Sequence, residues 1–371
     1  MEMFVCCLLF AVGVVLVIKG GDAFVDAASW IARAMNIPTF IIGATIVSLA
    51  TTMPEMIVSV MAAAQGKVDM AVGNAVGSVI ANTGLIMAVA MMAMAIPCSR
   101  KKYLRQCLLL TATAAVLVLG CRGGQLGIGW SGVLIVLFLL FMAENLRSAR
   151  SEMKSAESHE PVDKKELLKN IGKFILAAAA IVLGSRLMVD NGSSIAAFLG
   201  VPERIVALTL VAVGTSLPEL VTTITAIVKK ESALSVGNII GANIIDLSLI
   251  LPLSSLAAGE PLPVSAQSAA VDLPACLIIT VLALLPLMLR QKSSKVQGAA
   301  LLAAYAVYLF IVLYKNSRIF VRLFFCYLLV SLQVSMQKFL TPQWGQVSRR
   351  SLGVCRAKKA SLKRGLNTWW H

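Results

Sequence analysis

Long apolar runs separated by short polar stretches dominate the chain. Hydropathy places ten of them near residues 3–20, 37–64, 69–96, 104–120, 127–146, 168–190, 203–228, 233–257, 270–289 and 296–314. An apolar run of about 20 residues is long enough to cross the hydrocarbon core of a bilayer as a helix. The pattern therefore predicts an all-α integral membrane protein with ten transmembrane helices.

One polar segment, SARSEMKSAESHEPVDKKE at 148–166, divides the ten runs into two sets of five. We expect a first five-helix repeat at 1–147, a solvated linker at 148–166, a second five-helix repeat at 167–315 and a basic tail at 316–371.

The two halves share a repeated motif. Residues 41–86 and 205–250 align without a gap, and fourteen of the 46 positions are identical. Five predicted spans separate corresponding points of the two copies, and five is an odd number. The copies therefore enter the membrane from opposite faces, related by a pseudo-two-fold axis in the membrane plane. We expect two inverted repeats that bring equivalent residues together near the bilayer midplane.

Three acidic residues lie deep within these apolar runs, and all fall on motif positions. Glu55 aligns with Glu219, and Asp246 aligns with Asn82. Glycines at four-residue spacing in each copy are explained by helix packing alone. Packing does not require carboxylates, which are costly in a membrane and mark functional sites.

Oxygen ligands surround these acids in the sequence. A proline precedes each glutamate, so each helix should kink and free a backbone carbonyl. Hydroxyls or an amide follow the same plan; the candidate site comprises Glu55, Glu219, Asp246, Asn82, Thr51, Thr52, Thr215, Ser216 and Ser78. Such oxygens are the ligands of hard cations. With no Lys or Arg in these segments, a divalent ion would leave one net negative charge and three monovalent ions would leave none.

Composition excludes other classes. The only histidines are His159 in the linker and His371 at the last position, so no histidine metal site, proton relay or catalytic triad fits within the membrane. The eight cysteines form no CxxC pair and suit small buried side chains. We expect a protein that is not an enzyme and carries no cofactor.

Basic residues orient the chain. Loops on the linker side carry 18 Lys and Arg, whereas loops on the other side carry 4. The positive-inside rule then predicts a multi-pass protein of the plasma (inner) membrane, with a cytoplasmic linker and an external N-terminus.

The tail at 316–371 contains ten of the 33 basic residues and no acidic residue. Three interpretations stay open: an eleventh span at 319–340, a basic amphipathic element on the membrane surface, or a non-native end. A polybasic run beside a membrane meets anionic lipid more simply than nucleic acid, so no nucleic-acid partner is expected.

Two paired motifs carry a family resemblance over roughly residues 1–315. GTSLPE at 214–219, ATTMPE at 50–55 and the GNxxGxxxxD/N runs at 73–82 and 237–246 resemble the alpha-repeats of the sodium/calcium exchanger and cation/calcium antiporter superfamily, in its bacterial and archaeal branch. The resemblance implies that Glu55, Glu219, Asn82 and Asp246 line central ion sites, supported by the hydroxyls named above. It also implies alternating access, with sodium or protons moving against calcium. Ala242, where the family often has serine, and Ser48, opposite Ala212, are departures.

The sequence thus favours a secondary antiporter that exchanges calcium for sodium or protons. One alternative is a proton-coupled exchanger of another divalent cation, since carboxylates also bind manganese and magnesium. Another is a passive cation channel, although channels usually build their filters from several subunits. The expected partners are inorganic cations and the lipid bilayer; the oligomeric state stays open.

Overall fold

The computed structural model describes residues 2–94, 100–155, 163–199, 214 and 216–314. These residues fall almost entirely in one compact unit, Met1–Val312. The tail at 316–371, with its predicted eleventh span, lies outside the described residues, as does Thr215.

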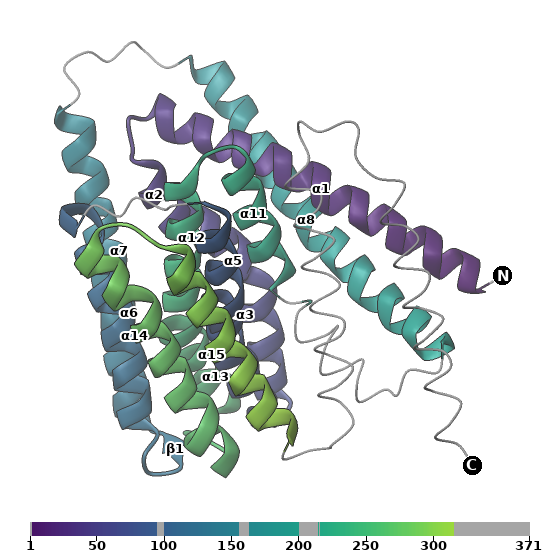
Figure 1. Cartoon of the computed structure of the whole chain (residues 1–371), viewed down its shortest axis with the longest axis vertical. Coiled ribbons are helices and arrows are strands. Elements are labelled where there is room, and N and C mark those ends of the chain that lie inside the picture. Colours follow the sequence, from purple (N-terminus) through teal and green to yellow (C-terminus); the bar gives the residue numbers. More distant parts are fainter. Residues whose placement is uncertain (1, 95–99, 156–162, 200–213, 215, 315–371) are drawn as a thin grey trace. The chain divides into compact units, whose positions relative to one another are not determined.

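The described part of the chain is helical throughout, apart from one short strand pair. Its elements are α1 (Glu2–Ala34), α2 (Thr39–Ile42), η1 (Gly43–Val47), α3 (Ser48–Ala64), α4 (Val68–Ala81), η2 (Asn82–Ile86), α5 (Met87–Ala93), α6 (Arg100–Gly120), α7 (Ile128–Ser155), α8 (Lys164–Phe198), α11 (Leu217–Val228), α12 (Ser232–Ile245), η4 (Asp246–Ile250), α13 (Leu251–Ala258), η5 (Ser268–Asp272), α14 (Leu273–Arg290) and α15 (Lys295–Tyr314), where η marks a π-helix (Figure 1). Strands β1 (Gln125–Leu126) and β2 (Leu262–Pro263) pair antiparallel.

Nine helical segments in the described residues are long and apolar enough to cross a membrane, and α11 is a shorter apolar helix. Each predicted run except 203–228 corresponds to one of these segments, and α11 covers the described end of that run. The all-α membrane fold predicted from hydropathy is confirmed.

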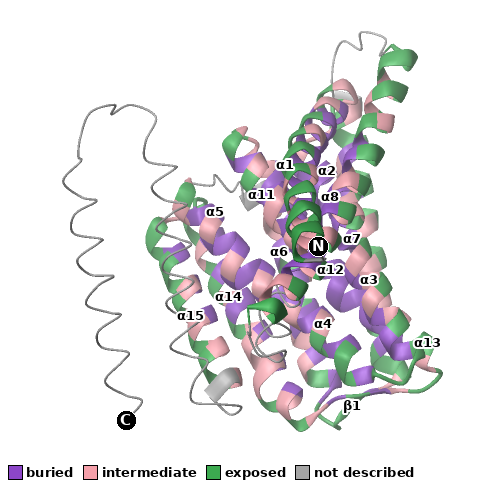
Figure 2. Ribbon diagram, turned by 90° about the vertical axis from the view of Figure 1, so that its right-hand side faces the viewer, coloured by how far each residue is buried: buried purple, intermediate pink, exposed green. Residues whose placement is uncertain are grey.

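Burial separates the central helices from the peripheral ones (Figure 2). In the most apolar window of the segment from Ser232 to Ala258, 83% of residues are buried, against 17% for α1 and 22% for α7 and α15. Apolar side chains such as Phe4, Val136 and Val307 are exposed on those outer helices, as expected of surfaces that face lipid. Among the described spans, the one that carries the end of the second motif copy, Ser232–Ala258, is therefore the most buried.

Helix α1 extends well beyond the apolar run at 3–20 and pairs with α8 (Figure 1). The stretch after residue 20, which hydropathy alone assigns to a loop, is helical to Ala34. Its continuation buries one face through Phe24 and Ala28, and Phe24 stacks on Phe174 of α8 with ring centroids 4.4 Å apart. Both ends of the predicted linker at 148–166 are helical as well, because α7 continues to Ser155 and α8 begins at Lys164.

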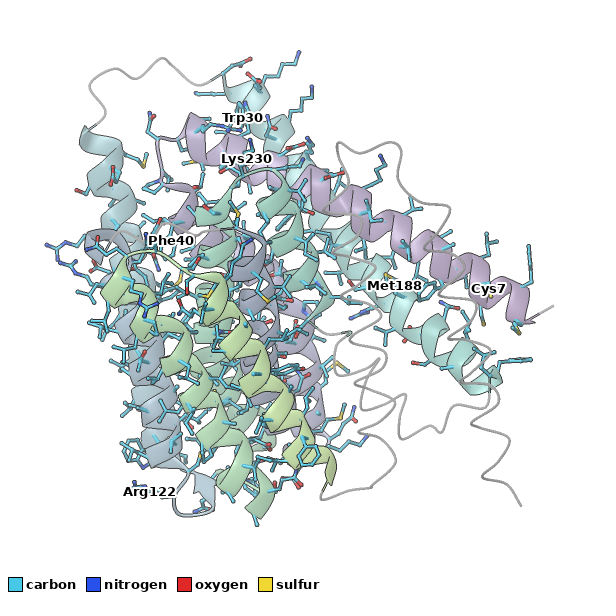
Figure 3. All side chains as sticks on the ribbon, viewed as in Figure 1. Cys7, Trp30, Phe40, Arg122, Met188 and Lys230 are labelled. Atoms are coloured by element: carbon cyan, nitrogen blue, oxygen red, sulfur yellow. The ribbon has the colours of Figure 1, made fainter. Side chains whose placement is uncertain are left out.

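Residues from different predicted loops lie at opposite ends of the helices. Trp30 and Lys230 lie at one end of the helices and Arg122 at the other, while Cys7 and Met188 lie on α1 and α8 (Figure 3). Loops that hydropathy assigns to opposite sides of the membrane are thus found at opposite ends.

The second half packs into the first through glycines of α12. A Cβ atom added to Gly241 would lie 2.5 Å from the Ala44 carbonyl oxygen, and one added to Gly237 would overlap the Phe40 carbonyl. Packing therefore explains these two glycines. Gly73 and Gly77 have no such neighbour among the described residues; the segment that the repeat would place against them, around 204–208, lies outside those residues.

Candidate ion-binding site

Two helical hairpins, one from each half, position the candidate residues. Thr51, Thr52 and Glu55 lie on α3, which is followed by α4, and Glu219 lies in the first turn of α11, which is followed by α12. Pro54 lies inside a continuous α3, whereas Pro218 lies at the start of α11. Equivalent prolines thus occupy a helix interior in one half and a helix start in the other.

The amide and the aspartate occupy matching places at the ends of the two hairpins. Asn82 is the first residue of π-helix η2, and Asp246 is the first residue of π-helix η4. The two residues align with each other in the repeated motif, 164 residues apart. A π-helical turn inside an α-helix disturbs the regular hydrogen bonding and is frequent at functional sites. The same local distortion has therefore been kept in both copies at the same residue.

The three acidic side chains and Asn82 are buried, and the acids interact with one another. The side chains of Glu55, Glu219, Asp246 and Asn82 are at most 1% exposed. Glu55 interacts electrostatically with both Glu219 and Asp246, and Asp246 interacts with Glu219. The three carboxylates thus interact with one another in the fold, although Glu55 lies 164 residues from Glu219 and 191 residues from Asp246 in the sequence.

Hydroxyl groups of the first half contact the second half. Thr52 Oγ1 donates to Glu219 Oε1 over 3.3 Å, and Thr51 Oγ1 donates to Asn238 Oδ1 over 3.2 Å. The Asn238 amide in turn donates to Thr222 Oγ1 over 3.0 Å. These bonds tie α3 to the α11–α12 hairpin directly at the acidic residues.

The equivalent side chains of the other half make different hydrogen bonds. Asn74, the equivalent of Asn238, bonds within its own half: it donates to Ser59 Oγ over 2.9 Å and to the Glu55 carbonyl oxygen over 3.3 Å. Ser216, the equivalent of Thr52, is 3% exposed and its hydroxyl has no partner among the described residues. The two halves therefore hold equivalent side chains in different hydrogen-bonding states.

Six buried acceptor oxygens at the site lack a hydrogen-bond donor in the described residues. They are Glu55 Oε1 and Oε2, Glu219 Oε2, Asp246 Oδ1 and Oδ2, and Asn82 Oδ1. Each buried acceptor left unpaired costs about 1–3 kcal/mol, and charged ones cost more. Helices α3, α4, α11 and α12 contain no Lys or Arg that could neutralise them. A cation bound among these oxygens would satisfy them.

A metal ion at this site would need more than one type of oxygen ligand. In the described part of the chain, no three His, Cys, Asp or Glu side chains gather closely enough to hold one metal ion by themselves. An ion beside Glu55 and Glu219 would therefore use hydroxyl, amide or carbonyl oxygens as well. Ser78, 5% exposed on α4 one turn before Asn82, and Ser216 supply such groups.

Sequence reasoning missed two features of this region. The first is the Asn238–Thr222 pair, although Asn238 belongs to the repeated GN motif. The second is Asp272, a further acid within a membrane-spanning segment, which accepts hydrogen bonds from Ser268 over 3.0 Å and Tyr308 over 3.1 Å. It has no acidic counterpart in the other half, so the repeat gave no signal for it.

Comparison with known proteins places this arrangement in a family. The sodium/calcium exchanger protein family matches residues 6–146 and 169–314. Inner membrane protein YrbG of Escherichia coli is 35% identical over 258 residues, covering 67% of this chain and 78% of its own. Sodium/calcium exchanger MaX1 of Methanosarcina acetivorans is 28% identical over 347 residues, covering 83% and 98%.

Solved structures agree. The sodium-calcium exchanger NCX_Mj, soaked with 2.5 mM Na⁺ and 10 mM Sr²⁺, superposes with a TM-score of 0.73 at 28% identity, over 85% of this chain and all of that one. The inverted-repeat architecture expected from the motif spacing is consistent with this match. The chain belongs to the sodium/calcium exchanger family, whose members are membrane transporters and not enzymes.

Proposed function

We propose that this protein is a secondary antiporter that exchanges calcium for sodium across the membrane by alternating access. The central observation is the group of six buried, unpaired acceptor oxygens on Glu55, Glu219, Asp246 and Asn82. Family membership supports cation and calcium exchange in general. The coupling to sodium and the alternating mechanism are the parts that we propose.

The transported ions would bind where the two hairpins meet. Glu55 and Glu219 serve as the anionic ligands, with Thr51, Thr52 and Ser216 as neutral oxygens beside them. Asn82, Ser78 and Asp246 line the adjoining part of the site, and Thr215 completes the set by its motif position. Carboxylate, hydroxyl and amide oxygens together make the ligand set that calcium and sodium prefer.

Charge balance explains why exchange, and not one-way release, suits this site. Three carboxylates carry three negative charges when ionised, and leaving them bare in the membrane is costly. One calcium ion leaves one negative charge, and three sodium ions leave none. Each ion species can therefore replace the other, whereas an empty site is the unfavourable state.

The different hydrogen-bonding states of the two halves support alternating access. Thr52 holds Glu219 across the repeat boundary, while Ser216 makes no equivalent bond to Glu55. In a protein made of inverted repeats, exchanging the states of the two halves turns a site open to one side into a site open to the other. We propose that the Ser216–Glu55 bond forms when the site faces the opposite side.

The proposal includes the orientation of the chain across the membrane. The excess of Lys and Arg on the linker side assigns the linker to the cytoplasm and the N-terminus to the exterior of the plasma membrane.

The test is uptake of radiolabelled calcium into proteoliposomes containing the purified full chain. Separate samples receive an outward sodium gradient, an outward proton gradient or no gradient of either ion. We expect uptake against the calcium gradient only with sodium. Uptake driven by protons alone would favour a proton-coupled exchanger, and rapid equilibration that needs neither gradient would favour a channel.

A further inference from the structure

A groove between α1 and α8 lies outside the ion site. Its volume is about 560 Å³, and it is a shallow surface groove that is open along one side. Small residues make the room, among them Gly20, Ala23 and Gly172. The open side exposes apolar surface, with Val15 57% and Leu176 73% exposed, as expected of a groove that faces lipid chains.

Three lysines line this otherwise apolar groove: Lys19 on α1, and Lys169 and Lys173 on α8. Lys19 lies at the end of the apolar run 3–20, and Lys173 lies near the start of the run 168–190, just before the uninterrupted apolar stretch that begins at Phe174. Both therefore lie near the ends of the apolar runs, where a lysine can reach the interface. Lys169 and Lys173 are four residues apart and share one face of α8.

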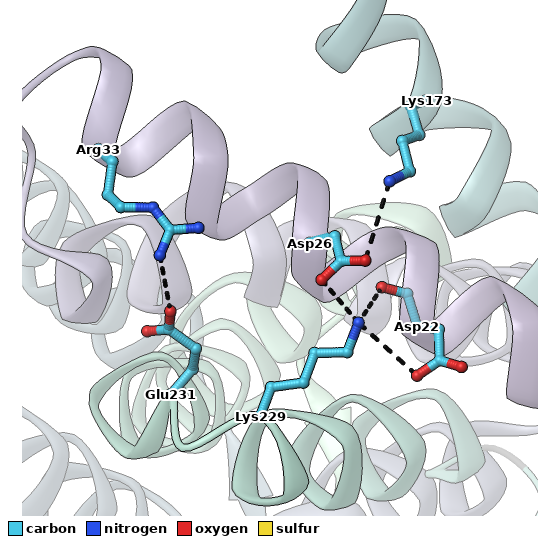
Figure 4. A network of polar contacts seen from close by, with 6 residues as sticks. All are labelled: Asp22, Asp26, Arg33, Lys173, Lys229 and Glu231. Carbon is cyan, nitrogen blue, oxygen red and sulfur yellow. Dashed lines mark hydrogen bonds and ion pairs between the residues drawn. The ribbon is translucent and has the colours of Figure 1, made fainter.

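Few acidic side chains of the described residues pair with these three lysines. In the described residues, Lys19 and Lys169 make no ion pair, and Lys173 lies 3.9 Å from Asp26 with 45% of its side chain exposed. Asp26 already has a closer partner in Lys229, at 2.6 Å, within the polar network that joins α1 and α8 to the end of α11 (Figure 4). An anionic group in the groove would therefore meet two lysines without an ion pair in the described residues and a third, Lys173, whose pairing with Asp26 is long.

We propose that this groove binds an anionic phospholipid from the leaflet on the linker side. The phosphate lies among Lys19, Lys169 and Lys173, and an acyl chain lies along Val15, Leu16, Leu176 and Ala180. Basic pockets between membrane helices are suited to anionic headgroups, and the apolar floor selects a lipid over a free phosphate. This inference does not depend on the ion that the protein carries.

The groove offers two independent variants. K19Q/K169Q removes charge and keeps most of the side-chain volume. Gly172→Leu fills the groove and keeps the charge, and a Cβ at this position meets no atom within 4 Å, so the helix accommodates it. The matched control is K164Q/K165Q, which removes two charges from exposed positions at the start of the same helix, outside the groove.

The experiment is native mass spectrometry of the purified full chain, titrated with dioleoyl phosphatidylglycerol or dioleoyl phosphatidylcholine. We expect the wild type and the control to retain phosphatidylglycerol preferentially. Because lysines near a membrane surface attract anionic lipid, K19Q/K169Q should bind phosphatidylglycerol about tenfold or more weakly than the wild type. Gly172→Leu should lose phosphatidylglycerol binding comparably. Equal retention of both lipids by the wild type, unchanged binding in both groove variants, or an equal loss in the control would overturn the proposal.

Discussion

Thr52 and Glu219 show how a single hydroxyl connects the two halves. The hydroxyl donates to the buried carboxylate from the opposite repeat, and the neighbouring Thr51 hydroxyl interacts with the same carboxylate. We propose that this hydroxyl positions the carboxylate besides offering an oxygen to the ion, so its loss should affect ion affinity more than turnover.

We therefore predict that Thr52→Val raises the calcium concentration for half-maximal transport and leaves the maximal rate nearly unchanged. Hydrogen bonds to charged groups contribute about 1.5–3 kcal/mol; at 3.3 Å we expect about 1–2 kcal/mol, or about five- to thirtyfold in affinity. Thr45→Val is the control, because the Thr45 hydroxyl bonds only to the Ile41 carbonyl in its own helix. A fall in maximal rate without a change in affinity would contradict a positioning role.

Asp246 and Asn82 are the point where the two halves differ in charge. Asp246→Asn makes them alike and leaves two carboxylates, whose charge one calcium ion balances completely. We predict that sodium-driven calcium uptake falls at least tenfold, whereas calcium-for-calcium exchange in the absence of sodium persists. Measuring both fluxes in the same proteoliposomes separates the outcomes. Equal loss of both would mean that Asp246 is needed for calcium itself.

The principal carboxylates could be predicted from sequence because each carries two signals, an ionisable group in an apolar run and a counterpart in the other repeat. Asp272 carries only the first signal and lies near the end of its run. The Asn238–Thr222 bond carries neither, since Thr222 aligns with Val58 and hydroxyls are common in helices. Hydrogen-bond partners depend on the angle at which two helices pack, and the hydrophobic periodicity of the sequence does not predict that angle.

At the scale of elements, close contact between α12 and η1 holds the second hairpin against the first. Gly241 lies where any side chain would meet both the Ala44 carbonyl and the Ser48 hydroxyl, each at 2.5 Å. Backbone atoms cannot rotate away, so a methyl group here must move a helix.

We predict that Gly241→Ala destabilises the protein by about 1–3 kcal/mol, the usual cost of overpacking. Thermal unfolding in detergent, followed by the loss of the monodisperse peak in gel filtration, measures the effect. Gly172→Ala is the control, since a Cβ there is free of neighbours and alanine favours a helix. Unfolding of Gly241→Ala at the wild-type temperature would show that the contact is loose.

Helix boundaries were the weakest part of the sequence-based picture. Hydropathy ends the first run near residue 20 because charged residues follow, yet the helix continues because Phe24, Ala28 and Ile31 bury one face. The charged side chains lie on the other face and bond to Lys229 and Lys173. An amphipathic extension of an apolar helix has low mean hydropathy, and only its periodicity distinguishes it from a loop.

At the scale of the whole molecule, the count of spans and the charge asymmetry favour the topology that we propose, with a cytoplasmic linker and an external N-terminus. In a variant freed of its native cysteines, we predict that Ser151→Cys reacts with a membrane-impermeant thiol reagent only from the cytoplasmic side. Gly123→Cys should react only from outside. Both positions are exposed. Labelling of both from one side would contradict the inverted arrangement, because an even number of spans would then separate them.

The same method addresses the tail. A cysteine at Ser348 should label from the cytoplasmic side if 319–340 forms an eleventh span. External labelling would exclude that span and leave the interpretation of a surface element or a non-native end.

The central claim is that Glu55 and Glu219 bind the transported calcium ion, and one flux measurement tests it most directly. Wild type, Glu55→Gln, Glu219→Gln and the exposed-site control Glu260→Gln are reconstituted at equal density, and sodium-driven uptake of radiolabelled calcium is recorded. We predict at least a tenfold loss in each of the two buried-site variants, because an amide keeps the shape but removes a ligand charge, and wild-type uptake in the control. Undiminished uptake in Glu55→Gln and Glu219→Gln would contradict the assignment of the ion site.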